Sequence, residues 1–558
     1  MRDAKKMEKI REGQRVVLKA NGYSDADLKR PLIGIVNTYN EVLPGHNHYH
    51  QLTQYLREGV HRAGGAVAEF GTISICDGMS APHTGENYVL PSRDLIADSV
   101  EAVARGEALD GLILMASCDK IVPGLLMAAA RLDIPCIMQI GGPMLGTIRF
   151  NGRKADLTSY PEALGLYQDK KITCDELDGM TEVVCPACGS CQFYGTANSM
   201  GCFAEAIGMT NTGAALIPAV YTDRKRDCVA TGEAIVELVK KDITARQIIT
   251  LESLKNGIAV AEGTGASTNL ILHTLAIAHE IGLDPDEVLP LFNEYKDKTP
   301  LVAHVNPNAD FDMEDFYKAG GIPRVMQNLS SVLNLDVMTV SGKTMGENLE
   351  AYRFKYPANT DVIRTMDDAF EPTGGLVILR GNLAPDSAVA KPSGIEKENR
   401  VFTGPALVFD SEADCMKAIA EDKVKPGNVI VIRYEGPKGG PGAREMGFAL
   451  KMLRGKGLLS DISVITDGRY SGTNNGCFVG HVSPEAAQGG PIAIVRDGDI
   501  ITVDVVDKRE VHLHLSDEEI AARLAEWKYQ PKKLTGQLAR YAALVQSCNT
   551  GAILDVKQ

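Results

Sequence analysis

The sequence predicts an α/β fold, because apolar runs typical of buried strands alternate with segments of helical periodicity over its first part. The strand-like runs are short, mostly apolar, and lie at residues 31–37, 67–75, 112–115 and 134–140. The helical segments between them are residues 51–63, a stretch that Ser92 would cap, and a stretch that begins at Pro123. We therefore expect a parallel sheet wound with helices.

Two longer segments, residues 193–214 and 251–281, have largely helical periodicity. The second is interrupted by a polar, glycine-rich run at residues 263–269. A phosphate or carboxylate could bind at the helix start that follows this run, or the glycines could serve close packing alone. The sequence does not decide between these interpretations.

After about Gly374 the chain changes to short β-rich runs separated by glycine turns, at residues 375–379, 428–432 and 492–495. A chain of 558 residues is too long for one core. We expect an N-terminal α/β domain at residues 1–380 and a C-terminal, β-rich, barrel-like α/β domain at residues 381–558.

Composition limits the classes of partner. The formal net charge of −14, with both signs mixed along the chain, argues against nucleic acid and anionic membranes. No stretch approaches the roughly 20 apolar residues of a transmembrane helix, and the first residues lack the apolar segment of a signal peptide. We expect a cytoplasmic protein whose 12 cysteines are reduced, as core residues or metal ligands.

A run that contains a thiol, a carboxylate and an amine follows the third predicted strand. Residues 117–123 read Ser-Cys-Asp-Lys-Ile-Val-Pro, which places Cys118, Asp119 and Lys120 at the carboxyl edge of the sheet. Thiolates favour iron–sulfur clusters or zinc, whereas carboxylates favour magnesium. Adjacent cysteine and aspartate therefore predict two metal centres close together.

A second group of thiols is spaced as Cys185-x-x-Cys188-x-x-Cys191. This spacing resembles an iron–sulfur run, and a structural zinc site is the alternative. Cys118, a distant thiol beside a carboxylate, favours a cluster with an open catalytic iron over a closed zinc site.

Three weaker signals come from loops. Asp77 could join Asp119 around a hard cation, although the Asp-Gly that it begins is also a common turn. Glu445 ends a glycine-rich loop after a strand, where a carboxylate is usually only a partner of the helix dipole. Ser471 follows another strand, close to Arg469, in a sequence that is more often a simple turn.

Four motifs occur together in one known family. They are Cys118-Asp119-Lys120 with Pro123-Gly124, Gly189-Ser190-Cys191 with Thr196-Ala197-Asn198, Gly436-Pro437-Lys438-Gly439, and Thr466-Asp467-Gly468-Arg469. In this order, over nearly the whole chain, they resemble the dihydroxy-acid dehydratase family, which includes 6-phosphogluconate dehydratase and other sugar-acid dehydratases. Its members remove water from a 2,3-dihydroxy acid to give a 2-keto acid, with an iron–sulfur cluster and, in many members, a magnesium ion.

The resemblance implies roles for individual residues. Cys118 and Cys191 would be cluster ligands, and Ser471 would be the catalytic base. The magnesium ligands would be Asp77, Asp119, Glu445 and a carbamylated Lys120. Carbamylation would turn a cation that repels the metal into an anionic oxygen ligand. The resemblance also implies a homodimer that acts on a small dihydroxy acid.

The chain departs from the two-iron members of that family, which carry a third cysteine near the first strand, where this sequence has Gly45. The third thiolate must then come from Cys76, Cys185 or Cys188. This pattern is similar to members with a four-iron cluster, so we expect [4Fe-4S] rather than [2Fe-2S].

Two branches of the family share features with this chain. Residues 192–195 and 76–78 are similar to the sugar-acid branches, whereas residues 296–300 and 320–323 are similar to the branched-chain amino acid enzyme. The leading hypothesis is dehydration of 2,3-dihydroxy-3-methylbutanoate and 2,3-dihydroxy-3-methylpentanoate in valine and isoleucine biosynthesis. The alternatives are a gluconate-type or 6-phosphogluconate dehydratase and, in another class, a non-catalytic iron–sulfur or zinc protein that senses metal or oxygen.

Overall fold

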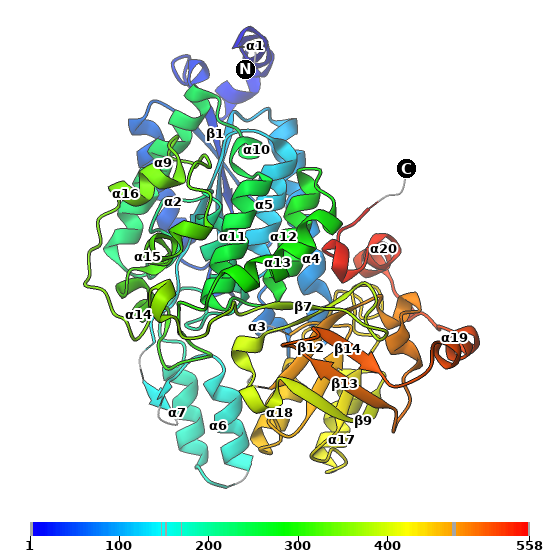
Figure 1. Cartoon of the computed structure of the whole chain (residues 1–558). Coiled ribbons are helices and arrows are strands. Elements are labelled where there is room, and N and C mark those ends of the chain that lie inside the picture. The colour runs from blue at the N-terminus through cyan, green and yellow to red at the C-terminus, as the bar shows by residue number, and fades with distance from the viewer. Residues whose placement is uncertain (1–3, 147, 151–152, 169, 471–475, 556–558) are drawn as a thin grey trace.

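A computed structural model describes residues 4–146, 148–150, 153–168, 170–470 and 476–555. Figure 1 shows an N-terminal part, blue to green, in which helices surround a small sheet, and a C-terminal part, yellow to red, built on a larger sheet. None of the described helices is long and apolar enough to cross a membrane. The predicted α/β fold class is confirmed.

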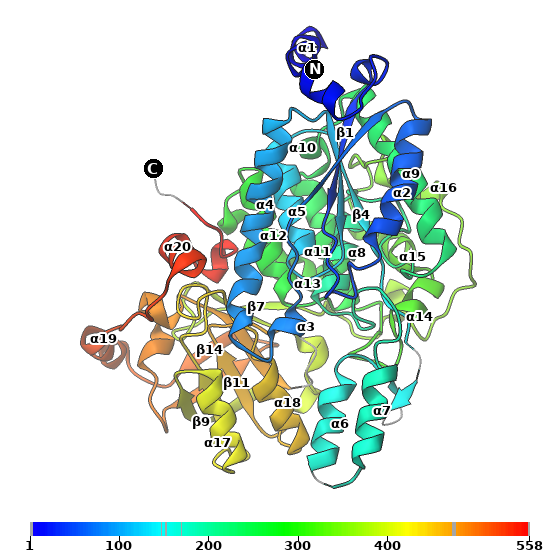
Figure 2. The same ribbon diagram turned by 180° about the vertical axis from the view of Figure 1, so that it is seen from behind.

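The N-terminal sheet has four parallel strands in the order β2-β1-β3-β4. They are β1 Leu32–Asn37, β2 Ala66–Gly71, β3 Gly111–Ala116 and β4 Cys136–Ile140. Every residue of β1, β3 and β4 is buried, because helices cover both faces of the sheet. As Figures 1 and 2 show, one side is covered by α2 Tyr49–Arg62 and α9 Thr222–Lys241, and the other by α4 Val89–Gly106 and α5 Ile121–Leu132.

Shorter elements complete this part of the chain. The other helices are α1 Ala4–Ala20, α3 Asp77–Ser80, α6 Ser159–Gln168, α7 Cys174–Val183, α8 Thr196–Ala206, α10 Ala245–Ile248, α11 Leu251–Thr264, α12 Asn269–Glu280, α13 Pro285–Lys298, α14 Met313–Lys318, α15 Gly321–Asn328 and α16 Met345–Ala351. A small hairpin pairs β5 Arg149–Phe150 with β6 Arg153–Lys154.

Two expected boundaries are wrong. Ser92 does not cap α4, because the helix already begins at Val89 and the Ser92 hydroxyl donates to the Val89 carbonyl inside it (2.7 Å). Strand β2 ends at Gly71 rather than at Ile75, since the chain leaves the core there and Ile73 is exposed.

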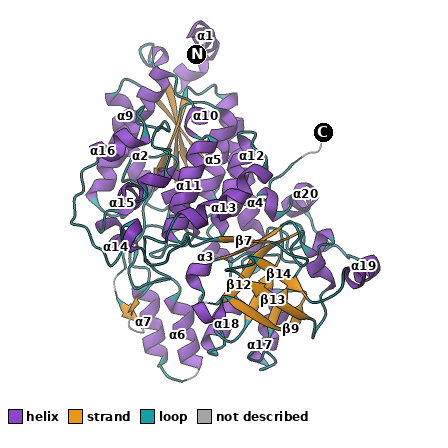
Figure 3. Cartoon of the chain, viewed as in Figure 1, coloured by secondary structure: helices purple, strands orange, loops and turns teal. Residues whose placement is uncertain are grey.

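The C-terminal sheet has eight strands in the order β14-β13-β9-β10-β11-β12-β8-β7. They are β7 Val377–Leu379, β8 Ser387–Ala390, β9 Val401–Phe409, β10 Val429–Ile432, β11 Ser463–Thr466, β12 Cys477–Ser483, β13 Ile500–Asp504 and β14 Glu510–Leu513, with helices α17 Glu412–Ala420, α18 Gly447–Gly455, α19 Asp517–Glu526 and α20 Gly536–Leu544. A bridge between Arg380 and Glu510 joins the ends of the two outermost strands, so the sheet curls into the barrel-like form that was predicted. Figure 3 shows these strands in orange, grouped below the helical part.

The strand predicted at residues 492–495 is wrong. Pro491–Ile494 forms a 3-10 helix whose apolar side chains are buried against the C-terminal sheet. Pro491 has no backbone N–H to donate to a neighbouring strand, which is why an apolar run here packs without pairing.

Strands β7 and β8 contribute to two cores. Ile378 and Val389 pack in the core of the N-terminal part, whereas Val377, Ala388 and Ala390 pack in the core of the C-terminal sheet. This alternation is the two-residue period of a strand that lies between two layers. The division of the chain at residue 380 stays a prediction, since the strands on both sides of it share both cores.

Candidate active site

Loops from both parts of the chain meet at the carboxyl edge of the parallel sheet. The loop after β3 carries Cys118, Asp119 and Lys120, and α3 begins at Asp77. From the C-terminal part, Glu445 and Arg469 are joined to each other by a backbone bridge and reach the same place. The edge at which parallel strands end is the usual position of an active site in open α/β sheets.

Three predicted magnesium ligands form an acidic cluster, which we define as Asp77, Asp119 and Glu445. One carboxylate oxygen of each lies within 4.8 Å of the others. The Lys120 ammonium, which is fully buried, donates to Asp77 Oδ2 at 2.7 Å and lies 3.5 Å from Asp119 Oδ2. The unmodified lysine thus supplies positive charge that a set of crowded carboxylates requires.

Arg469 links the two parts of the chain through three carboxylates. Its guanidinium donates to Glu445 Oε2 at 2.5 Å, to Asp77 Oδ2 at 3.2 Å and to Glu86 Oε1 at 2.7 Å. Arg469 and Glu86 are both almost fully buried, so these ion pairs are shielded from water. The sequence placed Arg469 in a family motif and beside Ser471 but gave it no role of its own, and no motif or spacing indicated Glu86.

The pKa values of the buried acids differ, because burial and the neighbouring charges act on each carboxylate to a different extent. Burial raises the pKa of Asp119 to about 6, and the adjacent Asp77 carboxylate raises it further. Burial also raises the pKa of Glu86 to about 8, despite its pairing with Arg469. The pKa of Asp77 is low although burial opposes ionisation, because Lys120 and Arg469 together favour its charged form. Perturbed acids in one cleft are typical of functional sites.

Several of the predicted thiols lie beside the acidic cluster. Cys76 and Cys118 influence each other: their interaction raises the pKa of Cys118 and lowers that of Cys76. Burial raises the pKa of Cys191, and Cys76, Asp119 and Cys185 raise it further. Burial raises the pKa of Cys188, a shift to which no other thiol contributes. The structure therefore brings Cys76, Cys118 and Cys191 together, with Cys185 near Cys191.

Gly45 faces the same thiols. A Cβ atom at this position would lie 3.0 Å from the Cys118 sulfur and 3.6 Å from the Gly189 carbonyl oxygen. A side chain at position 45 would therefore project into the space beside Cys118, where a cysteine would be near enough to act as a third ligand.

Ser471 lies outside the described residues. Its neighbour Tyr470 accepts a hydrogen bond from the Thr268 hydroxyl through its backbone carbonyl. Asn269, the first residue of α12, reaches Glu445 Oε2 at 3.5 Å and Thr196 Oγ1 at 3.0 Å. The glycine-rich run at 263–269 therefore borders the acidic cluster, and its role in binding an anion stays open.

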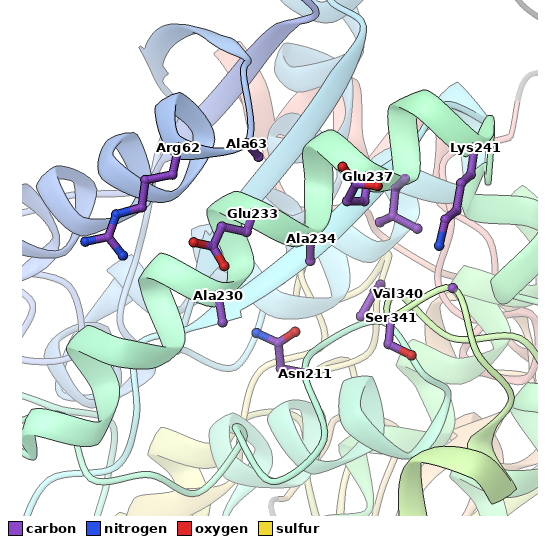
Figure 4. Close-up of a pocket in the computed structure, with 12 residues that line it drawn as sticks. Arg62, Ala63, Asn211, Ala230, Glu233, Ala234, Glu237, Lys241, Val340 and Ser341 are labelled. Atoms are coloured by element: carbon purple, nitrogen blue, oxygen red, sulfur yellow. The ribbon is translucent and has the colours of Figure 1, made fainter. Parts of the chain in front are cut away.

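A separate pocket of about 460 Å³ lies between α2, α9 and the loop at residues 340–342 (Figure 4). Its charged lining is of mixed sign and includes Arg62, Glu233, Glu237 and Lys241. None of the predicted site residues lines it, so we assign it no part in the chemistry.

Comparison with known proteins agrees with the geometry. Residues 30–348 match the model for the dihydroxy-acid/6-phosphogluconate dehydratase N-terminal region, and residues 361–552 match the one for the C-terminal region. A dihydroxy-acid dehydratase of Acetivibrio thermocellus is 48% identical over 100% of both chains. The dihydroxy-acid dehydratase of Pyrococcus furiosus is 47% identical and dihydroxy-acid dehydratase 1 of Methanosarcina acetivorans 44%, each over 98% of both chains.

These matches cover both parts of the chain and favour an enzyme over a metal- or oxygen-sensing protein. The prediction of a hydro-lyase is confirmed. The chain belongs to the dihydroxy-acid/6-phosphogluconate dehydratase family.

Proposed function

We propose that this enzyme dehydrates 2,3-dihydroxy-3-methylbutanoate, and its homologue 2,3-dihydroxy-3-methylpentanoate, to the corresponding 2-keto acids in cytoplasmic valine and isoleucine biosynthesis. The observation that carries the proposal is that three cysteines and three carboxylates, from both parts of the chain, lie near one another at the carboxyl edge of the parallel sheet. Relatives named dihydroxy-acid dehydratase, similar over the whole chain, support this choice of substrate.

The thiols suit an iron–sulfur cluster. Cys118, Cys191 and Cys76 are the proposed ligands, because each of these thiols lies near enough to another of the three to shift its pKa. Cys185 is the next candidate for the third position, and Cys188 is the least favoured. Three protein thiolates would leave one iron of a [4Fe-4S] cluster open to substrate.

The acidic cluster suits magnesium, which prefers carboxylate oxygens. Asp77 Oδ1 is buried and has no hydrogen-bond partner among the described residues, so one ligand oxygen is available. We propose Asp77, Asp119, Glu445 and a carbamylated Lys120 as ligands. When bound, the cluster would act as a Lewis acid toward the C3 hydroxyl, and magnesium would acidify the C2 proton.

The chain's own groups provide the rest of the chemistry. Ser471 is the proposed base that takes the C2 proton. The C3–O bond breaks, the departing hydroxyl takes up this proton to leave as water, and the resulting enol becomes the ketone. Arg469 holds Glu445 and Asp77 in place without entering the reaction. Burial of these groups excludes bulk water and strengthens each charge interaction.

The test is an assay of anaerobically reconstituted protein on the branched-chain dihydroxy acids and on gluconate and 6-phosphogluconate. We expect turnover of the branched-chain acids, together with bound iron and sulfide and an electron paramagnetic resonance signal from the reduced cluster. Activity confined to the sugar acids would overturn the choice of substrate.

Glu445→Gln separates catalysis from cluster assembly. We expect the variant to keep its iron and sulfide but to lose turnover by about 100-fold or more, because one magnesium ligand loses its charge. The exposed Glu421, which pairs with Lys423, provides a control: Glu421→Gln should be fully active. Full activity of Glu445→Gln would contradict the proposed magnesium site.

A further inference from the structure

Glu86 is a buried carboxyl group to which the proposed chemistry gives no role. It lies in the 3-10 helix Thr84–Tyr88 of the N-terminal part, and only 1% of its surface is exposed. Its Oε1 atom accepts hydrogen bonds from the Arg469 guanidinium at 2.7 Å and from the Glu445 backbone N–H at 3.4 Å. One oxygen of the N-terminal part therefore holds two residues of the C-terminal part.

The next residue fixes the same segment to the same loop. The Asn87 amide donates to the carbonyls of Gly440 and Pro441. Glu86 and Asn87 thus contact the glycine-rich loop before α18 at two points, one at Gly440 and Pro441 and the other at Glu445. The position of the Glu86 carboxyl group relative to Glu445 is therefore well defined.

Arg469 competes with a divalent cation for two carboxylates of the acidic cluster. Its guanidinium bonds one oxygen of each, Oδ2 of Asp77 and Oε2 of Glu445. The other oxygen of Asp77 is buried and has no hydrogen-bond partner among the described residues. A guanidinium stays charged at any pH at which the protein is folded, so a cation has to share these carboxylates with it. The strength with which Arg469 holds Asp77 and Glu445 should therefore influence the affinity for the cation.

The distances indicate that Glu86 keeps Arg469 from closing on Asp77. The same nitrogen, Nη2 of Arg469, lies 2.7 Å from Glu86 Oε1 and 3.2 Å from Asp77 Oδ2. Buried donors rarely stay without an acceptor. If Glu86 offered no oxygen, Nη2 would be expected to move toward Asp77, its other acceptor, and the guanidinium would compete more strongly with the cation.

We propose that Glu86 is a positioning residue of the divalent-cation site, which holds Arg469 and the Glu445 backbone so that Asp77 and Glu445 each keep an oxygen for the cation. This inference rests on the proposed function. Oε1 of Glu86 can accept in either protonation state of the carboxyl group, because Oε2 is buried without a partner among the described residues and can carry the proton. The role therefore depends on the acceptor oxygen rather than on the charge.

The experiment measures binding of Mn²⁺, in place of Mg²⁺, to anaerobically reconstituted protein that has been dialysed free of divalent cations. The electron paramagnetic resonance signal of free Mn²⁺ gives Kd without any need for turnover. We expect Glu86→Leu to raise Kd about 10-fold or more, the effect of losing a hydrogen bond to a charged group. Glu86→Gln keeps an oxygen toward Arg469, so its Kd should stay within about 3-fold of the wild-type value. Bound iron should be unchanged in both variants.

The matched control is Glu205→Gln. Glu205 is also a buried glutamate, but it accepts from the backbone N–H groups of Gly213 and Ala215, outside the acidic cluster. This variant should bind Mn²⁺ like the wild type even if its melting temperature falls. Glu86→Ala replaces the leucine variant if that variant does not fold.

Two results would overturn the role of Glu86. One is a wild-type Kd in Glu86→Leu, whatever its melting temperature, because the residue would then serve stability alone. The other is a Kd in Glu86→Gln as high as in Glu86→Leu, because the acceptor oxygen would then not matter. A wild type that binds no Mn²⁺ would instead overturn the proposed magnesium site, and this inference with it.

Discussion

At the residue scale, Lys120 shows how one side chain can serve two electrostatic roles. As an ammonium group it lies between Asp77 and Asp119 and neutralises their repulsion, as a metal ion would. As a carbamate it would bring a further negative oxygen, which the cluster could tolerate only if a divalent cation were present. Modification and metal binding at this residue are therefore expected to depend on each other.

Gly45 is the residue at which a small change tests the thiol site. In Gly45→Ala the added Cβ would lie 3.0 Å from the Cys118 sulfur, closer than an ordinary contact, so the space for a cluster shrinks. We predict lower iron and sulfide content per chain after anaerobic reconstitution. Gly447→Ala, where a Cβ would meet nothing within 4 Å, should bind iron like the wild type. Equal iron content in the two variants would contradict the location of the cluster.

At the element scale, the glycine-rich loop before α18 holds Glu445 against the N-terminal part. The Asn87 amide donates to the carbonyls of Gly440 and Pro441 at 2.8 Å and 2.7 Å. Gly442 has a φ of +94°, and a Cβ there would lie 2.4 Å from the Asn87 carbonyl oxygen. Both the left-handed backbone and the close approach require glycine.

Gly442→Ala should therefore displace the loop and with it Glu445. We predict a loss of turnover and weaker binding of Mg²⁺, measured by isothermal titration calorimetry. Gly457→Ala is the matched control, because Gly457 also has a positive φ of +70° but no atom within 4 Å of the added Cβ. The control shares the backbone strain of about 1–2 kcal/mol without the steric contact. If both variants bind Mg²⁺ equally well, the contact with Asn87 does not position Glu445.

Helices and strands with a clear pattern of apolar residues could be predicted from the sequence. Segments whose secondary structure depends on contacts with distant residues could not. The apolar run at 112–115 lies in β3 because strand composition and burial agree there. The run at 492–495 is also entirely apolar but lies beside Pro491, and packing rather than pairing decides its structure. Ser92 has the residue type of a helix cap, but α4 begins three residues earlier, at Val89, and this start is not marked in the sequence.

At the scale of the whole molecule, Arg469 joins the two parts through its carboxylate partners. Arg469→Met would leave Asp77, Glu86 and Glu445 buried without this cation, a change that typically costs about 3–5 kcal/mol. We predict that scanning calorimetry will show a lower melting temperature and a separate transition for each part. Arg433→Met removes contacts within the C-terminal part alone and should not split the transition. A single, unshifted transition in Arg469→Met would contradict the coupling.

Residues of the candidate site could be predicted from the sequence only where they belong to a recognisable motif. Cys118, Asp119 and Lys120 are adjacent in sequence, and their chemistry is evident from the residue types. Glu86 carries no such mark, since a single charged residue in an unremarkable segment is usually solvated. Only its burial and the approach of Arg469 from a distant segment distinguish it.

The central claim is that iron and a divalent cation occupy neighbouring sites between the two parts of the chain. Anomalous X-ray diffraction from anaerobically grown crystals, with Mn²⁺ in place of Mg²⁺, tests it most directly. We predict an iron signal beside the sulfurs of Cys76, Cys118 and Cys191, and a manganese signal among the oxygens of Asp77, Asp119 and Glu445. Iron bound elsewhere, or manganese absent from the acidic cluster, would contradict the claim.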